Sequence, residues 1–517
     1  MDKKVKDTKK KGLFGKFLDG VEKVGNKMPH PATIFLILCA AIVIISHIAS
    51  LAGVSVTYEG LDLHTNKIGQ VTVKAVSLLT PDGIRYMFTD AVKNFTGFAP
   101  LGTVLVAMLG VGVAEGTGLI SALLRKLVLS TPKRLITAVV VFAGVMSNIA
   151  SDAGYVVLIP LGAVIFLSFK RHPLAGIAAA FAGVSGGFSA NLFPGPTDAL
   201  LGGISTEAAK MFNPNFAVGA TANWYFLAVS TVLITIVGTF VTEKIVEPRL
   251  GAYKGNTATD VEGMTDAEKK GLKFALIGFL LTAAAIVALV APYNGILRDP
   301  KTHRILTSPF MSSIVVVISL AFLIPGIFYG IGAGTAKSDK SIVSLASKSM
   351  ASMGSYIVLV FVAAQFVAYF NYTKLGTILA VSGADFLSGA GITGIPLIIG
   401  FILITAFINL FMGSASAKWA IMAPIFIPMF MKLGYDPAFT QVAYRIGDST
   451  TNIISPLMSY FAMIVAFAEK YDEKSGIGTL ISTMVPYSLV FLATWTILLI
   501  VWYVLGLPIG PGAGIFM

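Results

Sequence analysis

Arginine and aspartate stand three residues apart in the segment "AYRIGDSTTNIISPLMSY", as Arg445 and Asp448. On a helix this spacing places both side chains on one face, where they could simply neutralise each other. A planar guanidinium also suits bidentate contact with a ligand carboxylate, and a carboxylate can hold a cation or a proton. Since ionisable groups inside apolar segments are costly, a functional role is the default interpretation. We therefore expect Arg445 to bind an anionic substrate and Asp448 to bind a coupling ion.

Asparagines mark several breaks between apolar runs. Amide and backbone oxygens suit a hard cation such as sodium, although asparagine also caps broken helices and both interpretations stay open. We assign ion coupling to Asn148, Asn191, Asn409 and Asn452, together with Asp152 and Asp448. A sodium site is expected at Asn409 and Asp448.

Other polar residues interrupt apolar runs. Asp198 follows a Pro-Gly-Pro break and either contacts substrate and carries protons or is a loop aspartate in water; Asp152 is similarly ambiguous. The stretch "MGSASAKWAIMAPIF" contains Ser414, Ser416, Lys418 and Trp419. We expect its serines to face substrate and Trp419 to stack on an aromatic ligand. For Lys418 we expect extension toward the lipid headgroups, as long cationic side chains commonly do.

The surrounding composition is that of a membrane protein. The 517 residues are 55% hydrophobic and 12% charged, with a mean hydropathy of +0.81. Apolar blocks long enough to cross a bilayer, which takes about 20 residues, occur at 33–53, 98–120, 224–244, 274–292, 308–329, 356–370 and 480–504. The sequence therefore predicts an all-α, polytopic membrane protein.

Composition also restricts the function. The net charge of +12 is concentrated partly in the tail "MDKKVKDTKKK", which indicates a cytoplasmic end beside anionic lipid rather than a nucleic-acid partner. One cysteine and five scattered histidines make neither a disulfide nor a thiolate metal site within one chain. Motifs such as HExxH and Walker A are missing from the sequence. We expect no enzyme activity and no cofactor.

Basic clusters set the expected topology. With residues 1–32 cytoplasmic, the segments 135–169 and 394–432 each have two ends on one side and a polar centre, as re-entrant hairpins do. We predict nine transmembrane helices plus these two hairpins, with the C-terminus outside. The first half spans 33–250 and the second 273–517, joined by a cytoplasmic linker at 251–272.

The two hairpin regions align at one spacing. Pro132 matches Pro396, Tyr155 matches Trp419, and further matches pair Pro160 with Pro424, Pro173 with Pro437, Gly183 with Gly447 and Ser185 with Ser449, each 264 residues apart. Since one hairpin enters from inside and the other from outside, the halves form an inverted repeat. Secondary transporters with this architecture bind substrate near the bilayer midplane, between hairpin tips and interrupted helices.

Several long motifs resemble one family over nearly the whole chain. They are "NFTGFAPLGTVL", "AAFAGVSGGFSANL", "VTEKIVEPRLG", "FINLFMGSASAKWA" and "AYRIGDSTTNIISPLMSY", which are similar to the p-aminobenzoyl-glutamate transporter (AbgT) family. The resemblance implies a dimeric, ion-driven transporter of nine helices and two hairpins in the bacterial inner membrane. It implies p-aminobenzoyl-glutamate uptake or sulfonamide efflux as the activity. Family residues associated with transport fall on Asp198, Asn409, Ser416, Trp419, Pro437, Arg445, Asp448 and Pro456.

The expected function is ion-coupled transport of p-aminobenzoyl-glutamate or related aromatic-amide carboxylates by a homodimer in the bilayer. A sodium-coupled dicarboxylate carrier of similar fold is the nearest alternative, and an ion channel is the alternative from another class. The sequence does not decide between import and export, because both use the same two-state cycle. Sodium and proton coupling stay equally open.

Overall fold

A computed structural model describes residues 29–62, 67–150, 154–253, 255, 263–305, 308–456, 458, 460–473 and 475–517. Two expectations lie outside these ranges, namely the structure of the basic tail over residues 1–28 and the position of Asp152.

Seven helices in the described ranges are long and apolar enough to cross a bilayer, or eight if the bent pair α6 (Leu119–Leu129) and 133–147 is one span. The seven are α2 (Pro31–Leu51), α5 (Ala99–Thr117), α11 (Trp224–Val241, continued to Leu250), α13 (Asp266–Val290), α15 (Ile314–Ala333), α17 (Gly354–Tyr372) and α23 (Ile477–Leu505). Each one coincides with a predicted apolar block. Helix α13 begins inside the expected linker, whose residues 266–272 are therefore helical.

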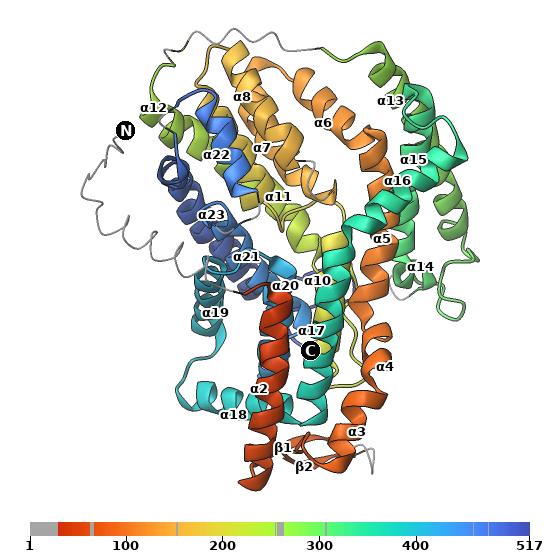
Figure 1. Ribbon diagram of the computed structural model, residues 1–517, viewed down its shortest axis with the longest axis vertical. Helices are drawn as coiled ribbons and strands as arrows, with labels where there is room; N and C mark the ends of the chain where they lie inside the picture. Colours follow the sequence, from red (N-terminus) through yellow and green to blue (C-terminus); the bar gives the residue numbers. More distant parts are fainter. Residues whose placement is uncertain are drawn as a thin grey trace, which may run out of the picture.

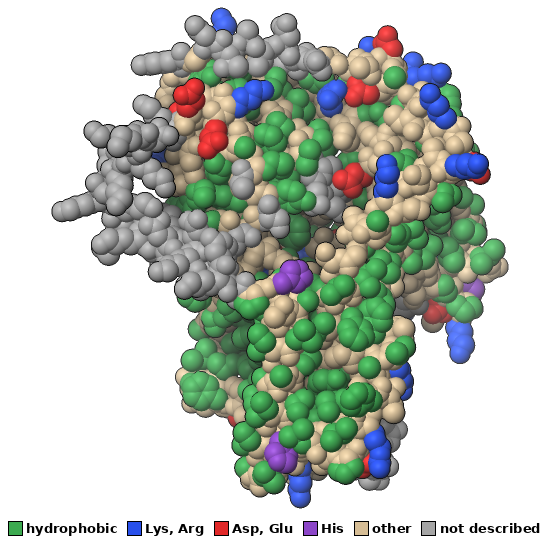
Figure 2. All heavy atoms as spheres, viewed as in Figure 1, with side chains coloured by type: hydrophobic (Ala, Val, Ile, Leu, Met, Phe, Trp, Pro, Cys, Tyr) green, Lys and Arg blue, Asp and Glu red, His purple; other side chains and the backbone are tan. Residues whose placement is uncertain are grey.

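The surface fits a lipid environment. On the face shown in Figure 2, hydrophobic side chains cover the region over α2, while charged side chains gather toward the two ends. Helix α2 itself exposes Leu36, Ile37, Ile44, Ile45 and Ile48. Apolar side chains cost no free energy when they face lipid, so these exposed residues are compatible with a helix that contacts the hydrocarbon core of a bilayer.

Shorter and interrupted helices follow one another in the region expected to form the first hairpin, 135–169, and in the segment after it. These are α7 (Ile136–Ser147), the 3₁₀ turn η2 (Asn148–Ala150), the π-helical turn η3 (Gly154–Leu158), α8 (Ile159–Ser168), α9 (Pro173–Phe181), the π-helical turn η4 (Ala182–Gly186) and α10 (Pro196–Ala209). Between η4 and α10 the chain runs without helix through Asn191 and a Pro-Gly-Pro sequence. Proline lacks a backbone donor and interrupts the helical hydrogen bonds there.

The second such region consists of α19 (Gly394–Asn409), α20 (Ala415–Lys432) and α21 (Pro437–Asn452). In Figure 1, α20 and α21 lie near the centre and α19 lies to their left. Helix α21 ends four residues before Pro456, and α22 (Phe461–Glu469) follows. Helices α19 and α20 both pack against α21.

In both regions a glycine lies where two segments of the chain cross in close contact. A Cβ atom on Gly183 would lie 2.3 Å from the Val141 carbonyl oxygen, and one on Gly447 would lie 2.5 Å from the Ile402 carbonyl oxygen. Both distances are too short for a side chain, so each crossing requires glycine. The crossing therefore supports the repeat inferred from the sequence.

The structure corrects the expectation of an all-α chain. Strands β1 (Ser55–Asp62) and β2 (Lys67–Lys74) form an antiparallel pair in which Ser55 faces Lys74. The sequence "SVTYEGLD" alternates apolar and polar residues, a pattern typical of a strand. Further elements are the short helices α3 (Pro81–Thr89), α4 (Ala91–Thr96), α12 (Glu247–Leu250) and α14 (Pro309–Ser312), with α16 (Asp339–Ser352) and α18 (Leu375–Gly389).

Candidate functional site

Helix α21 carries the densest set of buried polar side chains in the described part of the chain. All sixteen of its residues are buried, although it contains Thr440, Gln441, Arg445, Asp448, Ser449, Thr450, Thr451 and Asn452. Buried polar groups must find hydrogen-bond partners to avoid a large desolvation cost. Many of these partners come from α10, α19 and α20, which pack against the helix.

Arg445 forms a buried ion pair with a residue distant in sequence. Its Nη1 atom donates to Asp198 Oδ1 at 2.6 Å. The other carboxylate oxygen of Asp198 accepts the backbone N–H of Gly195 at 2.7 Å, at the N-terminus of α10. Asp198 is therefore not a loop aspartate in water. The Arg445 Nε atom is buried and has no hydrogen-bond partner in the described structure.

Lys418 forms a second buried ion pair. Its Nζ atom lies 2.5 Å from Asp448 Oδ1, and neither side chain is exposed by more than 1%. The same Nζ donates to Asn409 Oδ1. The expectation that Lys418 reaches the headgroups is wrong, because a carboxylate and an amide inside the protein already neutralise and solvate its ammonium. Arg445 and Asp448 consequently have separate partners and do not neutralise each other.

Asn409 joins α19 to the end of α21. Its Nδ2 atom lies within hydrogen-bond distance of the Asp448 backbone oxygen (2.6 Å), Thr451 Oγ1 (2.9 Å) and Asn452 Oδ1 (2.8 Å). The three asparagine and aspartate side chains predicted to share one site in the second half are thus brought together. The sodium ion predicted at Asn409 and Asp448 would have to displace the ammonium of Lys418.

Trp419 lies on α20, is fully buried and contacts residues of two other helices, α10 and α21. Its ring stacks on Tyr444 with centroids 4.4 Å apart, and its Nε1 donates to Ser205 at 3.0 Å. Ser205 donates to Gln441, which donates to Asn223 at 2.7 Å. In this conformation the Trp419 ring contacts protein on every side, so stacking on a ligand stays a prediction for another conformation of the protein.

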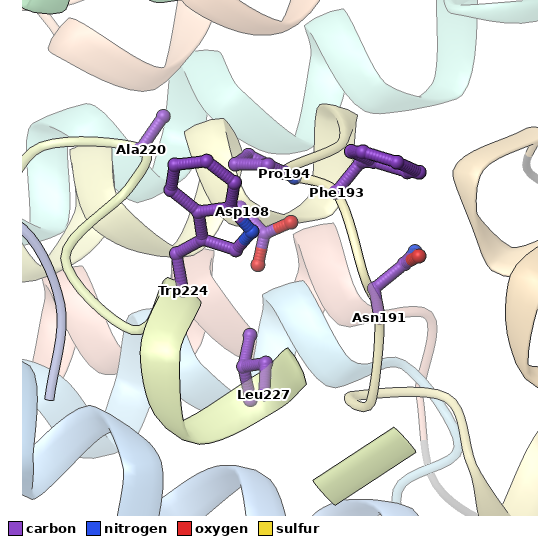
Figure 3. A pocket seen from close by; sticks show the side chains of 7 residues that line it. All are labelled: Asn191, Phe193, Pro194, Asp198, Ala220, Trp224 and Leu227. Atoms are coloured by element: carbon purple, nitrogen blue, oxygen red, sulfur yellow. The ribbon is translucent and has the colours of Figure 1, made fainter. Parts of the chain in front are cut away.

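The first half holds buried oxygens without partners. Asn148 donates from Nδ2 to the Val145 carbonyl at 3.1 Å, while Asn148 Oδ1, Asn191 Oδ1 and Ser189 Oγ are unpaired in the described structure. A small pocket is lined by Asn191, Phe193, Pro194, Asp198, Ala220, Trp224 and Leu227 (Figure 3). Asn191 and Asp198 therefore border the same space, next to the Arg445 ion pair.

The remaining predicted residues have local roles. Ser414 caps α20 by accepting the Ala417 N–H at 3.4 Å, and Ser416 lies 3.4 Å from it. Pro437 opens α21, where a proline is tolerated because the first N–H groups have no helical acceptor. Pro456 is half-buried beyond the end of α21. The structure brings these four close to the site's helices without giving them a polar contact to the ion pairs.

Four residues of the site were missed from the sequence. Ser205, Asn223, Gln441 and Tyr444 connect α10, α11 and α21, with Tyr444 Oη donating to the Ala415 carbonyl at 2.6 Å. One signal was available for Lys418, since a lysine within an apolar helix needs a counter-ion, and Asp448 is one of the two carboxylates, with Asp436, that follow it in the aligned region.

Interrupted helices, buried ion pairs and seven apolar spans together define a polytopic membrane transporter. Comparison with known proteins agrees, since a family model of AbgT transporters matches residues 16–517. The Escherichia coli K12 p-aminobenzoyl-glutamate transport protein is 42% identical over 498 residues, which is 96% of each chain. The chain belongs to the AbgT family.

Two solved structures have the same fold. The YdaH transporter of Alcanivorax borkumensis has a TM-score of 0.88 at 45% identity, covering 93% of this chain and all of that one. MtrF of Neisseria gonorrhoeae, described within a class of antimetabolite efflux pumps, has a TM-score of 0.90 at 51% identity, covering 96% and 100%.

Proposed function

We propose that this protein is an ion-coupled secondary transporter of p-aminobenzoyl-glutamate or related aromatic-amide carboxylates, with sulfonamide antimetabolites as further export substrates. The observation that carries the proposal is the buried Arg445–Asp198 pair beside a pocket, with Arg445 Nε unpaired. A substrate carboxylate can replace Asp198 as the partner of this guanidinium. The free Nε then gives the second donor of a bidentate contact.

The transport cycle follows from the replacement of Asp198 by a substrate carboxylate as the partner of Arg445. Burying a charged arginine alone would cost several kcal/mol, so Asp198 neutralises it when substrate is absent and the substrate carboxylate does so when substrate is bound. Freed Asp198 can take up a proton or face a cation, which links substrate binding to an ion. Asp448 with Asn148, Asn191, Asn409 and Asn452 forms the proposed ion-coupling set, while Ser414, Ser416, Trp419, Pro437 and Pro456 complete the substrate path.

The proposal includes an architecture. Nine transmembrane helices and two re-entrant hairpins, at 135–169 and 394–432, form an inverted repeat within a homodimer in the inner membrane. The N-terminus is cytoplasmic and the C-terminus outside. The repeated crossings at Gly183 and Gly447 support this arrangement, as does the likeness of the fold to two AbgT transporters.

The test is flux of radiolabelled p-aminobenzoyl-glutamate into proteoliposomes, with sodium and proton gradients imposed separately. Accumulation above the external concentration under one gradient, and none without it, supports the proposal and identifies the ion. Flux that only equilibrates would favour a channel. Folded protein that moves neither this compound nor a sulfonamide, but accumulates a dicarboxylate, would replace the substrate assignment with the dicarboxylate carrier.

A further inference from the structure

Two polar contacts connect α10 to α21 at different levels along these helices. At one level Arg445 Nη1 donates to Asp198 Oδ1 at 2.6 Å. At the other level the Ser205 hydroxyl donates to Gln441 Oε1 at 2.5 Å. Seven residues separate Asp198 from Ser205 on α10, and four separate Gln441 from Arg445 on α21. These spacings place both side chains of each helix on the same face, so an uncharged contact lies about two turns of α10 from the ionic one.

The uncharged contact belongs to a chain of buried hydrogen bonds that runs in one direction. The indole N–H of Trp419 can only donate, and it donates to Ser205 at 3.0 Å. The one hydroxyl hydrogen of Ser205 then points to Gln441 Oε1, so the amide N–H of Gln441 faces Asn223 and donates to its Oδ1 at 2.7 Å. Asn223 Nδ2 donates in turn to the Ala438 carbonyl oxygen at 2.9 Å. Gln441 thus joins α21 both to α10 and to the start of α11, and its side chain is buried.

This chain of hydrogen bonds ends beside the pocket that adjoins the ion pair. Asn223 directly precedes Trp224, whose side chain lines the pocket together with Asp198 (Figure 3). In the proposed transport cycle a substrate carboxylate replaces Asp198 as the partner of Arg445. That step removes the ionic contact between α10 and α21, whereas the uncharged contact contains no group that the substrate replaces. The uncharged contact can therefore keep the two helices together and the guanidinium directed at the substrate.

We propose that Gln441 is a positioning residue for substrate binding, which holds α21 against α10 and α11 while the ion pair between Asp198 and Arg445 is open. The inference deepens the proposed function and rests on it for the exchange of carboxylates. A glutamine suits this role because its amide group both donates and accepts without carrying a charge. Since both of its polar atoms are already hydrogen-bonded, Gln441 does not compete with Asp198 for the guanidinium or with Arg445 for the substrate.

The first test compares Gln441→Met with Gln365→Met in the proteoliposome flux assay. Methionine is close to glutamine in length and removes its hydrogen bonds. Gln365 on α17 is the matched control, because it is also buried and forms two hydrogen bonds with another helix, α4. It accepts from Asn94 at 3.0 Å and donates to the Ala91 carbonyl oxygen at 2.8 Å.

Both variants should lower the unfolding temperature, because each loses buried hydrogen bonds. Only Gln441→Met should raise the KM for p-aminobenzoyl-glutamate, by about 10-fold, the factor to which the loss of one hydrogen bond corresponds. Its maximal rate should stay within about 3-fold of the natural value, since the lost contact affects binding. An unchanged KM in Gln441→Met, or an equal rise in both variants, would overturn the proposal.

The second test needs no substrate and therefore separates this inference from the proposed function. Gln441→Met is introduced into the natural chain and into a background with Asp198→Asn and Arg445→Gln, in which the ion pair is replaced by an uncharged pair. If Gln441 holds the helices together when the ion pair is open, its loss should lower the unfolding temperature at least about twice as much in that background. Equal decreases in the two backgrounds would overturn the proposal.

Two provisions keep this second test decisive. Asp198→Asn alone is the background if the double variant gives no monodisperse protein, and the same difference between backgrounds is expected. A natural chain that moves no p-aminobenzoyl-glutamate would refute the proposed substrate. The comparison of unfolding temperatures would then still support or overturn the role of Gln441 in holding α21 against α10.

Discussion

Arg445 is the residue on which substrate recognition depends in the proposed cycle. Replacement by alanine should lower p-aminobenzoyl-glutamate flux by about 10- to 100-fold, because a charge-assisted hydrogen bond contributes roughly 1.5–3 kcal/mol. Asp198→Asn in the same background removes the carboxylate that alanine leaves unpaired, and thus separates lost recognition from a stranded charge. Flux at the natural rate through monodisperse Arg445→Ala protein would refute the role.

Trp419 shows how packing and recognition can be separated at one residue. Trp419→Phe keeps a ring against Tyr444 but removes the N–H that donates to Ser205. We expect flux within about 10-fold of the natural protein and a stability loss near 1 kcal/mol, the usual value of one hydrogen bond. Trp419→Ala should cost about 3–5 kcal/mol through the cavity it leaves. Thermal unfolding in detergent and flux measure both effects, and equal losses in the two variants would contradict this division.

At the scale of elements, the contact of α19 with α21 depends on the absence of one side chain. Gly447→Ala would place a Cβ 2.5 Å from the Ile402 carbonyl oxygen, so the helices must separate. We expect the free energy of unfolding to fall by about 1–3 kcal/mol, as is typical when a core is overpacked. Gly400→Ala on α19 is the matched control, since its Cβ would meet nothing within 4 Å. Comparable unfolding temperatures for the two variants would show that the crossing tolerates a methyl group.

The connection between α20 and α21 introduces a pH dependence. Burial raises the pKa of Asp436, in this connection, to about 6, although its carboxylate accepts the Ala438 N–H at 2.7 Å. An unfolded aspartate has a pKa near 3.9, so the folded protein prefers the protonated group. Stability from this residue is therefore greatest below about pH 4 and falls as pH rises through 6.

Asp436→Asn keeps the helix cap and removes the titration. The free energy of unfolding of this variant, relative to that of the natural chain, should rise by roughly 2–3 kcal/mol between pH 4 and pH 8, since each pKa unit corresponds to about 1.4 kcal/mol. Thermal unfolding at several pH values measures the difference. If the difference in stability between the two proteins does not change with pH, the carboxyl group of Asp436 does not titrate in this range.

At the scale of the whole molecule, α15 separates two exposed lysines that the proposed topology places on opposite sides. Lys301 precedes the helix and Lys337 follows it. In a background with Cys39→Ser, an impermeant thiol reagent should label Lys301→Cys in intact cells. Lys337→Cys should be labelled only after permeabilisation. Labelling of both from outside would show that α15 does not cross the bilayer.

Sequence patterns predicted the long elements better than the contacts between them. Apolar length alone located all seven spans, because lipid requires a nearly continuous apolar helix. The β1–β2 pair was missed because it is a short amphipathic segment outside the apolar blocks. Lys418 was misplaced because the usual behaviour of lysine holds only when no internal carboxylate is near, and Asp448 lies 30 residues further along the chain. Likewise, Asp198 lies 247 residues before Arg445, beyond the reach of local spacing.

Helix α21 has a consequence for biogenesis. A segment with one arginine, one aspartate and several hydroxyl and amide side chains partitions poorly into lipid, because each charge costs about 2.5–3.5 kcal/mol at the centre of a helix during insertion. Its partners Asp198, Lys418 and Asn409 all precede it in the chain. Insertion machinery must therefore keep α10, α19 and α20 together until α21 arrives. Variants that break either ion pair should therefore be degraded by cellular quality control. Their first measurable defect will be a lower amount of protein in the membrane.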